Sequence, residues 1–279
     1  MSGNGGRSTR RLVNRHPGRG GALLLGALPF LILAAVYLVA SNVRLATNPE
    51  DKLLPSPAAF ASAMHDYALA EDPRTGDILF WTDTLASLKR LAIALGISAV
   101  GGLSTGVFIG VVPYARATFA PSLAALSMIP PLAILPILFI VLGLGELAKI
   151  TLIAIGVTPV IARDIAMPAA ELPREQLIKA QTRGASTLQL TMRIVLPQMW
   201  PRLIDALRLT LGSAWLFLIA AEAIASTDGL GYRIFLVRRY LAMDVILPYV
   251  AWITLLAFLM DATLRRLRAA AFRWTELGH

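Results

Sequence analysis

The stretch LAIALGISAVGGLSTGVFIGVV, residues 91–112, carries no charged side chain. It is long enough to cross the hydrocarbon core of a bilayer, which takes about 20 apolar residues. Gly102, Gly106 and Gly110 recur every four positions within it, so a helix would carry them on one face. Small residues on one face let two helices approach closely in lipid. The stretch therefore predicts a membrane helix that packs tightly against a neighbouring helix.

The composition of the whole chain agrees with this prediction. Of 279 residues, 56% are hydrophobic and only 15% are charged, and the mean hydropathy is +0.66. A soluble domain of this length would carry more charge, so the chain is typical of an integral membrane protein. The net charge of +9 could suggest nucleic acid, but the positions of the charges favour a membrane and no nucleic-acid partner.

The sequence lacks two kinds of chemical machinery. There is no cysteine, which excludes disulfides, thiolate nucleophiles and cysteine-based metal sites. There is also no G-x-x-x-x-G-K-[ST] loop, so we expect any ATP to be bound by another chain.

Further apolar runs predict an all-α membrane protein with about six spans in total. Two of these runs are uncharged, and three are weaker because charges lie near their ends. The uncharged ones are 21–40 and the segment between Arg116 and Glu146, and the weaker ones are 147–166, 203–225 and 243–264.

The distribution of lysine and arginine predicts the orientation. Six spans put both termini on one side, and the segments on that side carry more basic residues, which predicts cytoplasmic termini. A cleaved signal peptide is the alternative for the N-terminus, but its apolar run is long and no convincing A-x-A site follows it. The sequence divides into a basic tail near anionic lipid, a first span, an outer segment, a core transmembrane domain with a cytoplasmic loop, and a cytoplasmic tail. Their predicted bounds are, in order, 1–20, 21–40, 41–90, 91–264 with the loop at 171–201, and 265–279.

Two short motifs imitate enzyme signatures. GLSTG, residues 102–106, matches the G-x-S-x-G elbow of serine hydrolases, but that elbow needs a strand, a sharp turn and a histidine partner. A membrane-embedded serine hydrolase is therefore a disfavoured alternative. GLGELA, residues 143–148, matches a dinucleotide fingerprint without the βαβ unit that it requires, and we interpret it as a tight hairpin between the third and fourth spans.

The segment RGASTLQLTMRIVLP, residues 183–197, differs from its surroundings because polar and apolar residues alternate in it. Gly184 is predicted to end one short helix in the left-handed conformation that glycine tolerates. Ser186 and Gln189 form the S-x-x-Q capping box of a second helix, which Pro197 would end.

The second helix would carry an apolar stripe. Its members, at helical spacing, are Leu188, Met192 and Val195. Such a stripe has to be covered, either by the membrane interface and the protein's own bundle or by a groove on a partner protein.

Several motifs carry a resemblance to a known family. Gly184, the nine residues after it and IVLP at 194–197 resemble the EAA loop of ABC importer permeases, whose pattern is E-A-A-x-x-x-G, nine residues and I-x-L-P. Four further motifs, in order, look like the nitrate/sulfonate/taurine/bicarbonate branch: LLPSP (53–57), PPLAILP (130–136), GLGELAK (143–149) and DGLGYRI (228–234). LIKAQ (177–181) and IFLVRRYLAMD (234–244) resemble permeases of urea-carboxylase-associated systems.

The resemblance implies a type I ABC importer transmembrane domain that passes a small polar solute inward by alternating access. It implies partner ATPase subunits inside, a solute-binding protein outside and a second copy of the permease in a homodimer. It also implies a bacterial plasma (inner) membrane location and a non-catalytic subunit with no metal or cofactor of its own. The residues that it assigns to ATPase coupling are Ala180, Gly184, Ala185, Ser186, Leu188, Met192, Ile194, Leu196 and Pro197. One departure is that Ile178, Lys179 and Ala180 stand where the pattern has Glu-Ala-Ala, so the acidic residue of the loop is missing.

Prolines and acids inside the spans are candidates for a translocation path or gate. Pro130, Pro131 and Pro136 break the third span, either to line a cavity or as a packing kink. Glu222 has no basic neighbour on its helix and lies near the outer end of the fifth span, where interface water could solvate it. We predict that it accepts hydrogen bonds around residues 228–232 at an outer gate.

Two further points concern the charges and the solute. Near the inner ends of the last two spans, Asp205 is expected to pair with Arg208, and Asp261 with Arg265. The family resemblance covers carriers of anions, sulfonates and small nitrogen compounds, and the solute stays open among them. An ion-gradient-driven secondary transporter is the main alternative, although the two halves show no convincing inverted repeat.

Overall fold

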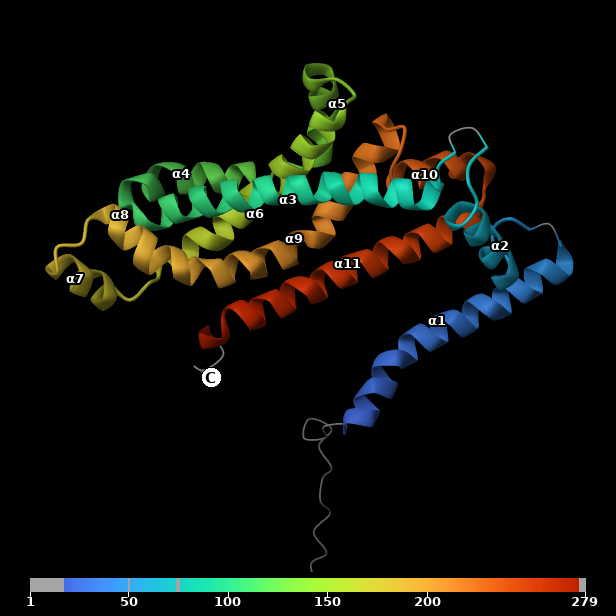
Figure 1. Cartoon of the computed structure of the whole chain (residues 1–279), viewed down its shortest axis with the longest axis horizontal. Coiled ribbons are helices and arrows are strands. Elements are labelled where there is room, and N and C mark those ends of the chain that lie inside the picture. The colour runs from blue at the N-terminus through green and yellow to red at the C-terminus, as the bar shows by residue number, and fades with distance from the viewer. Residues whose placement is uncertain (1–17, 50, 74–75, 276–279) are drawn as a thin grey trace, which may run out of the picture.

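The computed structural model describes residues 18–49, 51–73 and 76–275 of the chain. Within these residues every regular element is a helix (Figure 1). Most of the predicted basic tail (1–20) and the last four residues of the predicted C-terminal tail (265–279) lie outside the described residues. The all-α prediction is confirmed for the described part of the chain.

Four long helices run alongside one another as a bundle (Figure 1): α3 (Leu79–Val111), α6 (Glu146–Ala170), α9 (Leu196–Ala225) and α11 (Met243–Ala271). Helix α1 (Arg19–Thr47) lies at the side of this bundle. In the described residues, 5 helices are long and apolar enough to cross a membrane, or up to 6 if one bent helix pair counts as a single span. This agrees with the predicted number of spans.

The glycine face of α3 packs directly against α6. A Cβ atom added to Gly102, Gly106 or Gly110 would lie 2.5, 2.6 and 2.6 Å, respectively, from the nearest α6 atom, which is closer than real atoms approach. The motif that imitates a hydrolase elbow is therefore the contact face of a straight helix. On the α6 side, Leu152, Val157 and Ile161 are fully buried, because this helix forms the centre of the core.

The third predicted span is sharply broken. Helix α4 (Pro113–Leu126) and helix α5 (Pro131–Leu142) meet at an angle of 91° (Figure 1). Pro130 caps α5 and Pro131 opens it, where a missing backbone N–H has no cost to the helix. Pro136 lies inside α5, so the expectation that it also breaks the span is wrong. The hairpin predicted after α5 is present, with Gly143 at a φ of 75°.

Helix α3 begins earlier than the uncharged run in the sequence. It starts at Leu79, inside the segment 41–90 that was predicted to lie outside the membrane, because its charged side chains find partners within the protein. Helix α2 (Pro57–Ala68) and helix α10 (Leu230–Val237), followed by the short turn η3 (Arg238–Tyr240), lie at the same end of the bundle as the start of α3 (Figure 1).

Helices α7 (Arg174–Thr182) and α8 (Thr187–Leu190) lie at the opposite end (Figure 1). Gly184, between them, has the predicted positive φ, +79°. Pro197 does not end the second helix as predicted. The π-helical turn η2 (Thr191–Val195) joins α8 to α9, with the Leu196 N–H bonded to the Thr191 carbonyl, and this wider turn carries the chain into a proline-containing first turn of α9.

Candidate functional site

The segment after Gly184 is held by the predicted capping box. The Ser186 hydroxyl accepts from the Gln189 N–H at 3.3 Å, and the Gln189 side-chain oxygen accepts from the Ser186 N–H at 2.9 Å. Leu188 and Met192 are 66% and 54% exposed, so they form an uncovered apolar patch. Val195 was expected to extend this patch but is buried in the core, because the π turn rotates it inward.

The other residues predicted to couple to an ATPase surround that patch. Gly184, Ser186 and Pro197 are exposed as well. The half-buried members of the set are Ala180, Ala185, Ile194 and Leu196. Ile178, at the position of the missing acidic residue, is 56% exposed on α7. The end of the molecule that carries α7 and α8 therefore presents both apolar and polar groups outward.

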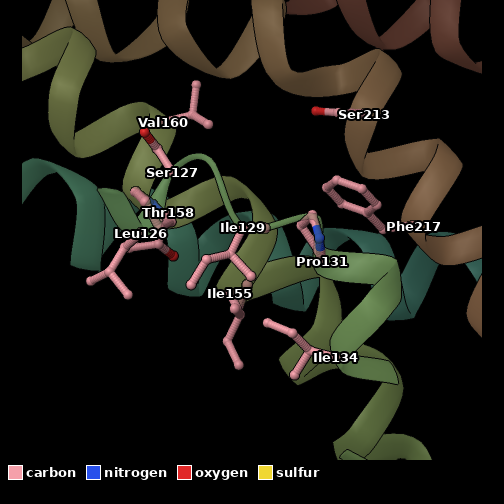
Figure 2. Close-up of a pocket in the computed structure, with 13 residues that line it drawn as sticks. Leu126, Ser127, Ile129, Pro131, Ile134, Ile155, Thr158, Val160, Ser213 and Phe217 are labelled. Atoms are coloured by element: carbon pink, nitrogen blue, oxygen red, sulfur yellow. The ribbon is translucent and has the colours of Figure 1, made fainter. Parts of the chain in front are cut away.

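A cavity of about 480 Å³ lies at the break between α4 and α5. Figure 2 shows Ser213 and Phe217 of α9 on one side of it and Leu126, Ile129 and Ile155 on another. The described lining residues include the hydroxyls of Ser127, Thr158 and Ser213 and no charged side chain. Of the three prolines predicted to shape a path, Pro131 lines the cavity, while Pro130 and Pro136 do not.

Arg90 organises a buried polar cluster at the end of the bundle that carries α10. Its guanidinium donates to Glu222 at 2.7 Å, to both carboxylate oxygens of Glu146 at 2.6 and 2.8 Å, and to the Asp228 carbonyl at 3.1 Å. It also contacts the Asp228 carboxylate. Arg90 is 3% exposed. One side chain of α3 therefore ties together α6, α9 and the loop before α10.

Glu222 is the most deeply enclosed acid of this cluster, with 0% exposure. Besides Arg90, it accepts from the Ser87 hydroxyl at 2.8 and 2.9 Å and from the Gly231 N–H at 2.9 Å. The predicted hydrogen bond from residues 228–232 is thus present. Glu222 has no basic neighbour on its own helix, as the sequence indicates, and its basic partner comes from α3 instead. Its burial excludes the alternative that interface water solvates it.

The glycines of the DGLGYRI motif make room for Glu222. A Cβ atom on Gly229 would lie 2.5 Å from Cδ of Glu222, and one on Gly231 would lie 3.0 Å from its Cβ. Gly229 also has a φ of +112°, which other residues rarely adopt. The motif therefore folds its backbone directly over the carboxylate.

A second ion pair extends the cluster. Asp83 of α3, which is 1% exposed, accepts from Arg233 of α10 at 2.7 Å and from the Gly229 N–H at 2.9 Å. Burial by itself lowers the pKa of the Arg233 guanidinium, but the hydrogen bond and the charge of Asp83 outweigh it, so this pKa lies above its ordinary value. Lys149 adds contacts of 2.9 Å to Glu146 and to the Ser226 hydroxyl.

The sequence signal for this cluster was weak. Arg90 and Asp83 precede the uncharged run 91–112, and a charge at such a position is ordinarily a solvated flank. The available clue was that Glu222 lies inside one apolar run while Arg90 borders another. The contacts that join them span 132 and 150 positions in the sequence, for Arg90–Glu222 and Asp83–Arg233 respectively, so local spacing did not reveal them.

Residues 100–273 match the family of binding-protein-dependent transport system inner membrane components. The chain belongs to this family. Among its relatives, the taurine transport system permease protein TauC of Escherichia coli is 34% identical over 71% of this chain and 72% of the relative. The putative aliphatic sulfonates transport permease protein SsuC of Escherichia coli is 27% identical over 92% of this chain and 95% of the relative. The bicarbonate transport system permease protein CmpB of Synechocystis is 28% identical over 85% and 84%.

The fold has a counterpart among solved structures. A chain of the MetNI methionine ABC transporter in an inward-facing conformation superimposes with a TM-score of 0.59 at 22% identity, covering 67% of this chain and 93% of that chain. The type I ABC importer fold and the nitrate/sulfonate/taurine/bicarbonate branch are thereby confirmed. The protein is a multi-pass permease subunit of an ABC importer, and neither the secondary transporter nor the serine hydrolase is favoured.

Proposed function

We propose that this permease forms, as a homodimer, the path by which a small polar solute crosses the membrane inward. Partner ATPase subunits bind ATP and dock on residues 183–197, so the permease needs no cofactor of its own. A solute-binding protein delivers solute to the opposite end, and both termini are cytoplasmic. The family assignment supports an ATPase and a binding protein as partners, because these are the components that an importer of this class works with.

One observation carries the proposal. The 39 residues of Thr187–Ala225 form one long, mainly helical element, which begins at the exposed Leu188 and ends beside the buried Glu222. Along the element, the path between these two residues is about 51 Å long at 1.5 Å per residue. Phe217 and Ser213 on the same element line the cavity at the broken span. Movement of the docking end is thereby passed to the cavity and to the outer cluster through a single helix.

The cavity beside the α4–α5 break supports a place for the solute along the path. A backbone break is tolerated at membrane depth where it lines a cavity or is buried in protein, and Pro131 does line the cavity here. Its hydroxyl groups can exchange hydrogen bonds with a small polar molecule, and its apolar walls bind that molecule weakly enough for release. Pro130 sets the direction of α5, and Pro136 acts only through the shape of that helix.

The polar cluster at the other end supports an outer gate. Arg90 and Glu222 join α3 to α9, and the backbone of Gly231 joins α9 to α10 through the same carboxylate. Opening outward separates these elements and breaks buried charged hydrogen bonds, each of which contributes about 1.5–3 kcal/mol. Energy of that size shifts an inward–outward equilibrium at least tenfold.

The class of solute can be inferred from the nitrate/sulfonate/taurine/bicarbonate branch to which the chain belongs. The named relatives transport taurine, aliphatic sulfonates and bicarbonate. We therefore propose a small polar solute of this kind, or a urea-like nitrogen compound as the LIKAQ and IFLVRRYLAMD stretches indicate. A direct test is to copurify tagged permease with the ATPase and binding protein encoded beside it and to measure ATP-driven uptake in proteoliposomes. Uptake by the permease alone, driven by an ion gradient, would overturn the proposal.

A further inference from the structure

A ladder of alternating charges joins α9 to α11 near the end of the bundle that carries α7 and α8. Both expected pairs are present, Asp205 with Arg208 at 3.6 Å and Asp261 with Arg265 at 3.0 Å. They are also joined across the helices, because Arg208 contacts Asp261 at 2.8 Å and Arg268 contacts Asp205 at 3.2 Å. The ladder therefore has an arginine at each end, with one more positive than negative charge.

A polar cavity of about 420 Å³ adjoins the Arg268 end of this ladder. It lies between the end of α6, the start of α9 and the end of α11, and both Arg268 and Arg202 line it. Within the described part of the chain, Arg202 has no hydrogen-bond or ion-pair partner. Glu171 is the one acid of the lining, so the lining carries a net positive charge.

The surroundings of the cavity resemble the boundary between lipid and water. The apolar part of α11 gives way there to Arg265, Arg266 and Arg268, and Trp274 of the short turn η4 (Arg273–Thr275) lines the cavity wall. Tryptophan is enriched at membrane interfaces, where its ring lies at the level of the headgroups. Met167 and Leu267, on the two helices that end at the cavity, are 57% and 52% exposed and offer an apolar surface beside it.

We infer that this cavity binds the phosphate group of an anionic phospholipid from the leaflet on the α7 and α8 side. Arg202 and Arg268 bind the phosphate, Trp274 lies against the headgroup, and the acyl chains follow the exposed face of Met167 and Leu267. Basic pockets between membrane helices bind anionic headgroups in this way. Because Gln198 and Met199 of the same lining directly follow the docking segment, the bound lipid braces the junction between that segment and the bundle.

The test uses the purified full-length chain in nanodiscs of phosphatidylcholine with or without phosphatidylglycerol. Lipid retained after extraction into detergent is counted by native mass spectrometry. We expect the wild type to retain phosphatidylglycerol in preference to phosphatidylcholine. Arg202→Gln should weaken that retention about fivefold, which is the contribution of one basic residue near an anionic surface. Arg202 is exposed, so the variant should fold normally.

The matched control is Arg239→Gln, which removes an exposed arginine at the opposite end of the bundle and should leave retention unchanged. If the wild type retained the two lipids equally, this result alone would overturn the inference. Equal losses in Arg202→Gln and Arg239→Gln would overturn the assigned site. Displacement of the retained lipid by millimolar inorganic phosphate would show that free phosphate is the ligand and would overturn the lipid source.

Discussion

At the residue scale, the cluster around Arg90 contains one enclosed carboxylate, Glu222, and two more exposed ones. The side chain of Glu222 is 0% exposed, whereas those of Glu146 and Asp228 are 56% and 42% exposed. All three share Arg90 as partner. Water can replace Arg90 for the exposed pair but not for Glu222, because a buried charge without a partner is strongly unfavourable. Arg90 and Glu222 therefore depend on each other more than the other pairs do.

Substitution of Glu222 tests the gate. Glu222→Gln keeps the shape and part of the hydrogen bonding, so we expect it to retain partial transport. Glu222→Ala removes contacts worth about 1.5–3 kcal/mol each and should let ATP hydrolysis continue while uptake falls. Uptake and ATPase rates are measured side by side in proteoliposomes with the binding protein present. An unchanged ratio of the two rates in Glu222→Ala would mean that the carboxylate does not gate transport.

Substitution of Arg90 tests whether Arg90 and Glu222 depend on each other for stability. Arg90→Gln leaves Glu222 buried without its cation, and breaking a buried pair in this way costs about 3–5 kcal/mol. We expect a larger loss of thermal stability in detergent than in Glu222→Gln. The double variant Arg90→Gln/Glu222→Gln should recover part of that loss, since it removes both charges. A double variant whose loss equals the sum of the single losses would contradict the assigned pairing.

At the element scale, contact between α3 and α6 depends on residues without side chains. Gly106 faces the Ala162 carbonyl oxygen at a distance that leaves no room for a Cβ, whereas Gly96 of the same helix has nothing within 4 Å. The face of α3 toward α6 therefore has no room for a side chain at Gly106, whereas the face that carries Gly96 has room for one. Replacing each of these glycines with alanine tests the effect of packing, because neither substitution changes the charge.

Gly106→Ala should lower stability by about 1–3 kcal/mol, because a methyl group forced into a packed contact displaces the neighbouring helix. Gly96→Ala should be neutral or slightly stabilising, since alanine is a better helix former than glycine. Thermal unfolding of both variants in the same detergent measures the difference. If the two melting temperatures were lowered equally, close packing at Gly106 would not be the reason for the small residue.

The docking segment is a second element that can be tested alone. Leu188→Asp charges the exposed apolar patch, and Gly184→Val forces a branched residue into a left-handed conformation at a cost of about 1–2 kcal/mol. We expect both to weaken ATPase association while the spans still insert. The controls are Leu69→Asp, which charges an exposed apolar residue at the opposite end of the bundle, and Gly26→Val, where nothing lies within 4 Å. Normal ATP-driven uptake in both Leu188→Asp and Gly184→Val would exclude this segment as the coupling element.

At the scale of the whole molecule, the two ends of the bundle differ in chemistry. The helices α7 and α8 lie at one end, and α2 and α10 lie at the other (Figure 1). The first end has the exposed apolar patch of Leu188 and Met192, and the second has the polar cluster around the buried Arg90 and Glu222. The cavity at the broken span lies between α4, α5, α6 and α9. This separation of the two ends agrees with the alternating access that we propose for this importer.

The orientation of this axis in the membrane is open to a direct test. The chain has no native cysteine, so a single cysteine at Ser62 or at Ser186 reports on one end alone. Both serines are exposed. In intact cells an impermeant thiol reagent should label Ser62→Cys and not Ser186→Cys, because basic residues favour the cytoplasmic side. The reverse labelling pattern would invert the proposed topology.

The sequence by itself determined the elements and the class of the protein. Apolar length predicted the spans, the spacing of Gly102, Gly106 and Gly110 predicted a packed face, and Ser186 with Gln189 predicted a helix start, because each of these depends on neighbours within a few positions. The EAA-like loop and the ordered motifs predicted the family. The predictions from helical periodicity were wrong at η2. The π turn places Val195 in the core instead of on the exposed stripe, and the helix continues past Pro197.

Only the tertiary structure decided which charges are buried and with which partners. Arg90 and Asp83 precede an apolar run and would be solvated on an isolated helix, yet they are buried because Glu222 and Arg233 approach from other helices. The ladder between α9 and α11 is a second example. The two pairs expected within each helix are present, but contacts between the helices also join them to each other. Spacing along one helix predicts only contacts within it, whereas desolvation and pairing of charges depend on all the helices packed around them.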